Sequence, residues 1–140
     1  MSVPVLFDRE DGVAILTLHE PTKRNAFSAE MARLLGEHLK RCDADDTVRA
    51  VVLTGTPPAF CAGADLSQGG DTFKGRDTGS FSAAAIPFPI WQVRKPVIAA
   101  VNGHAIGVGF TLTLQCDIRF FAAEATYGIV YASSSSCLGM

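Results

Sequence analysis

Short apolar runs alternate with polar stretches along most of the chain. Five of these runs lie at residues 3–8, 13–18, 50–54, 97–101 and 118–122. Short runs without helical periodicity are typical of β-strands. Two of the continuous ones, AVVLT and VIAAV, indicate fully buried strands. We therefore predict strands at these five positions.

A helical pattern follows Ser28. Apolar residues recur there every three or four positions, which predicts an amphipathic helix over residues 28–42 with Ser28 as N-cap. The apolar positions are Met31, Leu34, Leu35, Leu39 and Cys42. Such a face packs in a core or lines a ligand groove, and core packing is its ordinary role. Alternation of strands and helices implies right-handed crossovers and a largely parallel sheet, so the predicted fold class is α/β.

Two stretches of small residues each follow a predicted strand. FCAGADL, at residues 60–66, comes after the strand at 50–54 and a Gly/Pro loop. The second stretch begins at the Asn-Gly turn after Val101, and its Gly-Val-Gly at residues 107–109 opens an apolar run that is long enough for a helix. Helix starts carry unpaired N–H groups, and glycine lets a ligand approach the backbone closely. Two such loops can place one N–H each at a shared point, as an oxyanion hole requires.

The two stretches together carry a family resemblance. FCAGADL followed by KPVIAAVNGHAIGVGFTLTLQCDIR resembles the enoyl-CoA hydratase/isomerase (crotonase) superfamily. The likeness runs from about Val13 to Tyr127 and covers about the first half of a family member. It implies a crotonase-like layered ββα spiral, truncated before the C-terminal helical region. Residues 1–131 would form a partial core and residues 132–140 an atypical Ser-rich tail.

The resemblance implies an acyl-CoA thioester as ligand. Its carbonyl oxygen would accept hydrogen bonds from the backbone amides of Ala64 and Val108 in one shared cavity. One such donor contributes roughly 3–4 kcal/mol to a developing oxyanion. The family commonly has Gly-Gly-Gly where this chain has Gly107-Val108-Gly109. The amide survives that change, but the valine side chain should narrow the acyl pocket.

Contacts to the coenzyme A portion are implied in the same way. Lys23 and Arg24 occupy the segment that approaches the CoA phosphates in the family, although they would equally suit a solvated basic pair. Other positions of the family wrap the adenine and pantetheine, largely through backbone atoms. Those positions are Ala62, Gly63, Asp65 and Leu66. Asp65 would alternatively cap a helix that starts near Leu66.

The acid–base pair of the family's hydratases is missing. Two glutamates act on water in those enzymes, and the equivalent positions here are Thr111 and Tyr131. Neither is a carboxylate, and a tyrosine with a pKa near 10 is a poor base. The resemblance therefore predicts the fold and the ligand better than the hydration reaction.

Other residues are weaker candidates for catalysis. His104 is a natural acid–base type, but its position in the family is usually a packing residue. Asp71 and Asp77 lie in a Gly/Asp/Thr/Ser-rich loop, where some isomerases and lyases of the family carry an acid. Cys61 as a nucleophile has no basic neighbour in the sequence.

Composition excludes several classes of protein. Twelve basic and fourteen acidic residues give a net charge of −2 without a basic stripe, so nucleic acid is not an expected partner. The glycines fit neither a dinucleotide fingerprint nor a P-loop. The cysteines lack metal-ligand spacing, which favours reduced thiols, a cytoplasmic location and no metal site. We see no signal-peptide pattern and no apolar run approaching the ~20 residues of a membrane span.

Two hypotheses follow from the resemblance. The chain is a nominal enoyl-CoA hydratase/isomerase that works without the glutamate pair, or it is an inactive or incomplete acyl-CoA-binding protein. No separate cofactor is expected in either case, since coenzyme A is part of the substrate. A full-length family member would form a homotrimer or hexamer. Without the family's C-terminal helices this chain should expose apolar surface and be weakly stable or self-associating.

Overall fold

The computed structural model describes residues 3–65 and 86–129 of the 140-residue chain. The elements of the first part are β1 (Val5–Glu10), β2 (Val13–Leu18), η1 (Pro21–Lys23), α1 (Ala29–Ala44), β3 (Ala50–Gly55) and β4 (Ala59–Cys61). Those of the second part are η5 (Ile90–Gln92), β5 (Val97–Val101), β6 (His104–Ile106), α2 (Val108–Leu114), β7 (Ile118–Phe121) and β8 (Tyr127–Gly128).

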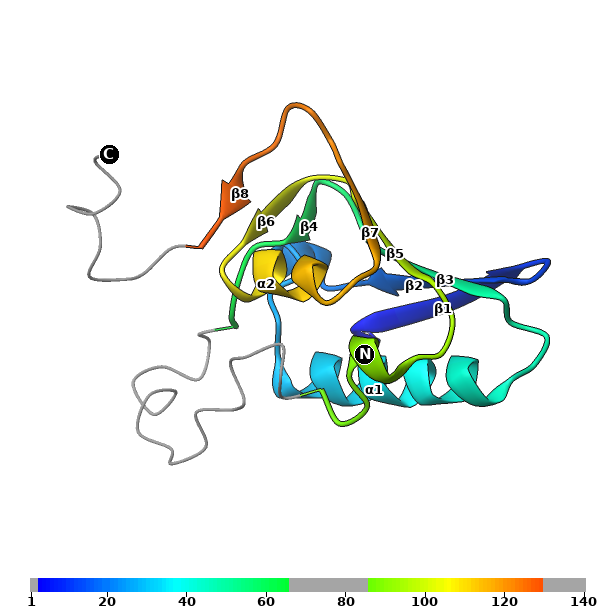
Figure 1. Ribbon diagram of the computed structural model, residues 1–140. Helices are drawn as coiled ribbons and strands as arrows, with labels where there is room; N and C mark the ends of the chain where they lie inside the picture. Colours follow the sequence, from blue (N-terminus) through cyan, green and yellow to red (C-terminus); the bar gives the residue numbers. More distant parts are fainter. Residues whose placement is uncertain (1–2, 66–85, 130–140) are drawn as a thin grey trace.

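Five strands form the larger sheet, in the order β1-β2-β3-β5-β7. The hairpin of β1 and β2 is antiparallel, and every other pair in this sheet is parallel. Helix α1 lies along one face of the sheet (Figure 1). The sequence prediction of a largely parallel sheet with crossover connections is confirmed.

The apolar patterns explain the packing between this sheet and α1. Alternate residues of β2, β3 and β5 are fully buried and the residues between them are partly exposed. The prediction that β3 and β5 are buried throughout is therefore wrong, because within the described residues only one face of the sheet meets a helix. On α1 the predicted stripe is buried at Met31, Leu35, Leu39 and Cys42. The hydroxyl oxygen of Ser28 accepts a hydrogen bond from the Met31 amide at 3.1 Å, so the predicted N-cap is confirmed.

A second sheet was not predicted. It contains three short parallel strands in the order β4-β6-β8 and lies beside α2, at one end of the larger sheet (Figure 1). The helix start predicted at Gly107-Val108-Gly109 is confirmed, because α2 begins at Val108, but the strand β6 between it and the Asn102-Gly103 turn was not predicted. Strands of two or three residues contain too few side chains to show an alternating pattern.

The chain's other departures from prediction are small. The first strand begins at Val5 instead of Val3, and α1 continues to Ala44. Residues 86–89 are not helical, in line with the prolines there, and only the short η5 follows. Several predicted features lie outside the described residues: Leu66, Asp71, Asp77, Tyr131 and the tail at 132–140.

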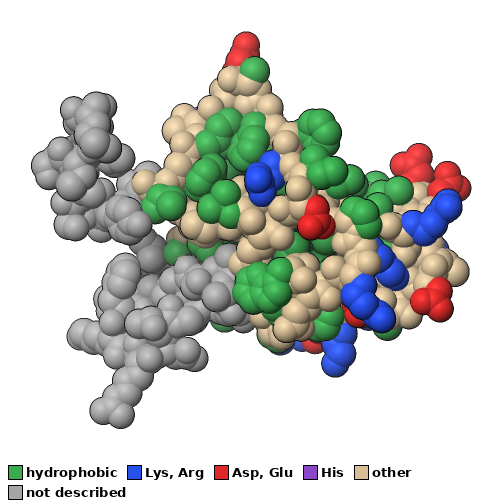
Figure 2. Space-filling model, viewed as in Figure 1, with side chains coloured by type: hydrophobic (Ala, Val, Ile, Leu, Met, Phe, Trp, Pro, Cys, Tyr) green, Lys and Arg blue, Asp and Glu red, His purple; other side chains and the backbone are tan. Residues whose placement is uncertain are grey.

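The edge strand β7 exposes apolar side chains. All four of its residues are exposed, including Phe120 at 65% of its surface, and Leu114 of α2 is 53% exposed. Figure 2 shows hydrophobic side chains gathered on the face that carries α2 and β7. Exposed apolar clusters of this kind favour association.

Candidate functional site

The two small-residue loops emerge at the same edge of the second sheet. Strands β4 and β6 are parallel neighbours, with Ala59 opposite His104 and Cys61 opposite Ala105. Their carboxyl ends therefore lie side by side, and residues 62–64 and 107–108 follow directly. A Cβ placed on Gly63 would lie 3.5 Å from the carbonyl oxygen of Ile106, which shows how close the two chain segments are.

Two glycines of the Gly-Val-Gly sequence are required for different reasons. Gly107 has φ 58° and ψ −120°, a conformation that residues with a Cβ rarely adopt. A Cβ on Gly109 would overlap the carbonyl oxygen of Cys61 and lie 2.8 Å from the Cys61 Cβ. Val108 meets neither restriction and is 8% exposed within the core. This explains why the middle position tolerates a side chain.

The amides of Ala64 and Val108 are both available. Phe27 pairs with Ala64 in a parallel bridge that uses the Gly63 carbonyl (2.7 Å) and the Asp65 amide (2.8 Å). The Ala64 amide itself therefore points away from Phe27. Val108 is the first residue of α2, where amides have no partner within the helix. Neither amide has an acceptor among the described residues. That they face one cavity stays a prediction.

The loop with Lys23 and Arg24 lies against the segment that contains Ala62 and Gly63. The Ala62 amide donates to the Arg24 carbonyl oxygen at 3.0 Å, and the Phe27 amide donates to that of Gly63. The structure therefore brings together the residues predicted to contact coenzyme A, apart from Leu66, which lies outside the described residues.

The two cations of this loop differ in their partners. The Lys23 ammonium lies 3.2 Å from Asp65 Oδ2, and its side chain is 48% exposed. The Asp65 side chain is 16% exposed, but the lysine end of the pair is solvated, so the pair contributes on the order of 1 kcal/mol and an incoming phosphate can compete for Lys23. Asp65 thus pairs with Lys23, and its alternative role as a cap for a helix near Leu66 falls partly outside the described residues. Arg24 is exposed and has no ion pair within residues 3–65 and 86–129.

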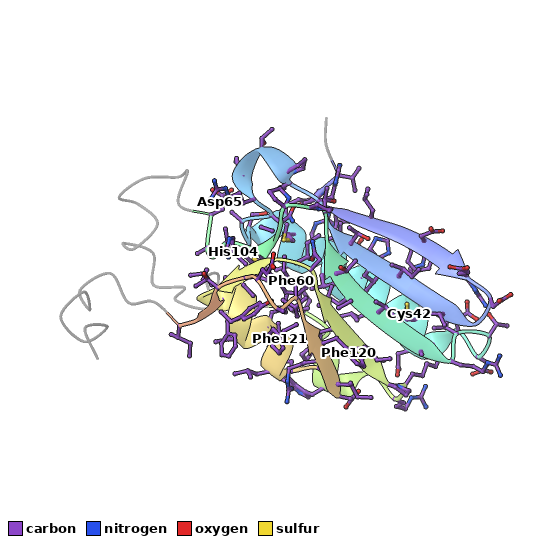
Figure 3. All side chains as sticks on the ribbon, turned by 90° about the horizontal axis from the view of Figure 1, so that it is seen from above. Cys42, Phe60, Asp65, His104, Phe120 and Phe121 are labelled. Carbon is purple, nitrogen blue, oxygen red and sulfur yellow. The ribbon has the colours of Figure 1, made fainter. Side chains whose placement is uncertain are left out.

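The other candidates have structural contacts. The Thr111 hydroxyl donates to the Val108 carbonyl oxygen at 3.2 Å, within its own helix. His104 is exposed, and its Nδ1 accepts the Thr126 amide at 2.8 Å, which joins β6 to the segment before β8. His104 and Asp65 lie at the same end of the molecule, far from Cys42 (Figure 3). Burial raises the pKa of the Cys61 thiol to about 11, which argues against a nucleophilic thiolate near neutral pH.

Asn25 is a residue of this region that sequence reasoning missed. It is fully buried and its side chain makes three hydrogen bonds. The only signal in the sequence was the residue type, since asparagine tolerates a left-handed backbone better than most residues do.

The described part of the chain contains neither a metal-binding cluster nor a membrane-spanning helix. It contains no group of three or more His, Cys, Asp or Glu residues arranged to hold a metal ion. No helix in it combines the length and apolar character needed to cross a membrane.

Comparisons with known proteins agree with this geometry. The sequence pattern of the family described as enoyl-CoA hydratase/isomerase matches residues 8–137. The enoyl-CoA hydratase AFT3-1 of Alternaria alternata is 42% identical over 116 residues, which cover 82% of this chain and 39% of that protein. The probable enoyl-CoA hydratase EchA14 of Mycobacterium tuberculosis is 38% identical over 128 residues, covering 89% of this chain and 49% of that one.

Solved structures show the same likeness in three dimensions. A probable enoyl-CoA hydratase/isomerase from Mycobacterium abscessus has a TM-score of 0.79 at 49% identity, covering 89% of this chain and 48% of that one. An enoyl-CoA hydratase/carnithine racemase from Magnetospirillum magneticum has a TM-score of 0.80 at 30% identity, covering 92% and 49%. The chain thus spans less than half the length of these relatives. With its layered α/β fold and its two paired loops, it belongs to the enoyl-CoA hydratase/isomerase family.

Proposed function

We propose that the chain binds an acyl-CoA thioester, with the amides of Ala64 and Val108 donating to the thioester carbonyl oxygen. The observation that carries this proposal is the parallel pairing of β4 with β6, which sets the two loops side by side. Neither amide has an acceptor among the described residues. Such donors stabilise an enolate or a tetrahedral oxyanion because they are in place before charge develops.

The coenzyme A portion would extend from these amides toward Lys23 and Arg24. Backbone hydrogen bonds hold that loop against residues 62–65, so one ligand reaches both places. We assign Arg24 the stronger phosphate contact, because its guanidinium has no described ion pair and suits bidentate contact with phosphate. Lys23 would exchange Asp65 for phosphate. No cofactor besides coenzyme A is required.

The proposed reaction class is that of a nominal enoyl-CoA hydratase/isomerase in fatty-acid or related acyl-CoA metabolism. The relatives' names include hydratase, isomerase and racemase, so the family alone leaves the reaction open. The second candidate is an acyl-CoA-binding protein without turnover. Thr111 favours this second candidate, because its hydroxyl is bonded to its own helix and is no base near neutral pH.

Titration with butyryl-CoA, which cannot be hydrated, tests the binding proposal. Val108→Pro removes the amide at the first position of a helix, where proline is well tolerated. Loss of one neutral hydrogen bond should weaken binding by about 3–10-fold. Val108→Ala is the matched control, since it shortens the same side chain and keeps the amide. Equal affinities for the two variants, or no binding by the parent chain, would contradict the proposal.

Hydration of crotonyl-CoA separates the two candidates. We expect negligible turnover by the parent chain and little recovery in Thr111→Glu, because the second glutamate position is Tyr131. Rates typical of an enzyme, on the order of 1–1,000 per second, would establish the enzyme and refute the inactive candidate.

The location and assembly of the full protein are part of the same proposal. The described cysteines Cys42, Cys61 and Cys116 are free and buried, which suits a reducing compartment such as the cytoplasm. A complete family member would assemble as a homotrimer or hexamer.

A further inference from the structure

Asn25 lies at the centre of a fully satisfied polar network. Its side chain is 0% exposed. The carboxamide oxygen accepts the Glu20 amide at 2.9 Å, and the carboxamide nitrogen donates to the carbonyl oxygens of Thr56 and Ala59, both at 2.8 Å. A buried amide whose donors and acceptor are all used is costly to replace, because any loss leaves buried backbone groups unpaired.

The partners of Asn25 belong to two different segments. Glu20 precedes η1 and the two basic residues, whereas Thr56 and Ala59 flank the turn that leads into β4. Immediately beyond these anchor points, the backbone bonds from Ala62 to Arg24 and from Phe27 to Gly63 continue the contact. We call this line of hydrogen bonds between residues 20–27 and residues 56–65 the seam. The Asn25 side chain lies at one end of the seam, and the proposed carbonyl-binding amide of Ala64 lies at the other.

We propose that Asn25 is a positioning residue that holds the Lys23–Arg24 loop in register with residues 62–64. The phosphate-binding cations and the carbonyl-binding amide would then keep one fixed separation before ligand arrives. This inference rests on the proposed acyl-CoA function for its consequence in binding, while the seam itself can be measured without ligand.

Two properties of position 25, its backbone conformation and its hydrogen bonds, favour asparagine over other residues. The backbone of Asn25 has φ 58°, and that of the preceding Arg24 has φ 51°, so two successive residues are left-handed. Asparagine tolerates this conformation better than most residues. The carboxamide also provides two N–H donors and an acceptor in one plane. Glycine meets the first requirement alone, and aspartate keeps the acceptor but has no N–H donors.

Hydrogen exchange of the free protein tests the seam. In Asn25→Asp and Asn25→Gly, the amides of Phe27 and Ala62 should exchange faster by about 10-fold or more, relative to amides of β2 and β5 in the same protein. Leu39→Ala is the matched control, because it destabilises α1 away from the seam and should raise exchange generally. The inference is overturned if the ratio of seam to sheet exchange is the same in the Asn25 variants and in Leu39→Ala.

Two ligands then test the consequence for binding. Butyryl-CoA reaches both the cations and the amides, whereas S-butyryl-pantetheine lacks the nucleotide and its phosphates. We expect Asn25→Asp to weaken the binding of butyryl-CoA by about 10-fold and the binding of S-butyryl-pantetheine by much less. Leu39→Ala should change the affinity for both ligands by one common factor. Equal weakening of both ligands in Asn25→Asp would overturn the positioning role. If the parent binds neither ligand, the proposed function fails, and the exchange ratios alone decide the inference.

Discussion

Replacing Gly109 by alanine tests the close approach of α2 to β4. A Cβ at this position would overlap the Cys61 carbonyl oxygen and lie 2.8 Å from the Cys61 Cβ. The first obstacle is the backbone of a fully buried strand residue, which cannot rotate aside. The strain is relieved only if α2 moves away from β4, and such a movement would also displace the Val108 amide.

The expected magnitude is a difference between two opposed effects. Inserting a methyl group into a well-packed core typically costs about 1–3 kcal/mol, and overlap with backbone belongs at the upper end of that range. Alanine in a helix interior gains about 1 kcal/mol over glycine, which is an upper bound here because Gly109 lies in the first turn of α2. We therefore expect Gly109→Ala to lower the free energy of unfolding by about 2 kcal/mol.

Urea denaturation followed by far-ultraviolet circular dichroism measures this change. Gly36→Ala, also inside a helix, is the matched control. Its Cβ would lie 3.0 Å from Pro87 Cδ and 3.1 Å from the Phe88 amide nitrogen, so a mild clash offsets the helix gain. We expect that control to stay within about 1 kcal/mol of the parent. A Gly109→Ala protein with the parent's midpoint or a higher one, at an unchanged slope, would refute the close approach of α2 to β4.

Three further predictions concern other parts of the chain. Burial, followed by the charge of Arg41, lowers the pKa of His38, which stacks on Phe7 at 5.3 Å. The stability due to neutral His38 should be present above its ordinary pKa of 6.5 and be lost as the pH falls through the lower folded value, so the urea midpoint should fall less on acidification in His38→Phe than in the parent. The Cys61 thiol, with a pKa raised to about 11, should resist iodoacetamide near neutral pH until urea unfolds the chain, and prompt labelling at Cys61 itself, located by peptide mass spectrometry, would contradict its burial. The exposed Phe120 on β7 should promote self-association, so sedimentation equilibrium should show a smaller mean mass for Phe120→Ser, and an equally monomeric parent would refute this role.

The three inner strands of the larger sheet, β2, β3 and β5, were predictable because they are continuous apolar runs with alternate residues buried, whereas most residues of the edge strands β1 and β7 are exposed. Ser28 and the stripe from Met31 to Cys42 likewise marked α1 and its start. The second sheet was not predictable in the same way, since Ala59–Cys61, His104–Ile106 and Tyr127–Gly128 are too short for periodicity.

The site was predicted from the family resemblance of its motifs and not from the contacts that form it. The resemblance pointed to Ala64 and Val108, and the structure sets their loops side by side. The sequence does not show why Gly109 must lack a side chain, because its obstacle, Cys61, is distant along the chain. Asn25 was missed for a related reason: its left-handed backbone and its three acceptor and donor partners exist only after the chain has folded.

The short strand β8 has a consequence for the order in which the chain folds. The Gly107 amide donates to the Gly128 carbonyl oxygen at 2.9 Å, so the loop that begins α2 is anchored from the far end of the described chain. The two residues are closer along the chain than the paired residues Val51 and Val97 of β3 and β5, so the cost of loop closure does not delay this contact. Its place in the order of folding depends on synthesis instead. On a ribosome, β1 to β3 and α1 could assemble while the later strands are still being made. The loop that begins α2 would gain this anchor only after residue 128 has emerged, so it would be fixed later than the first three strands.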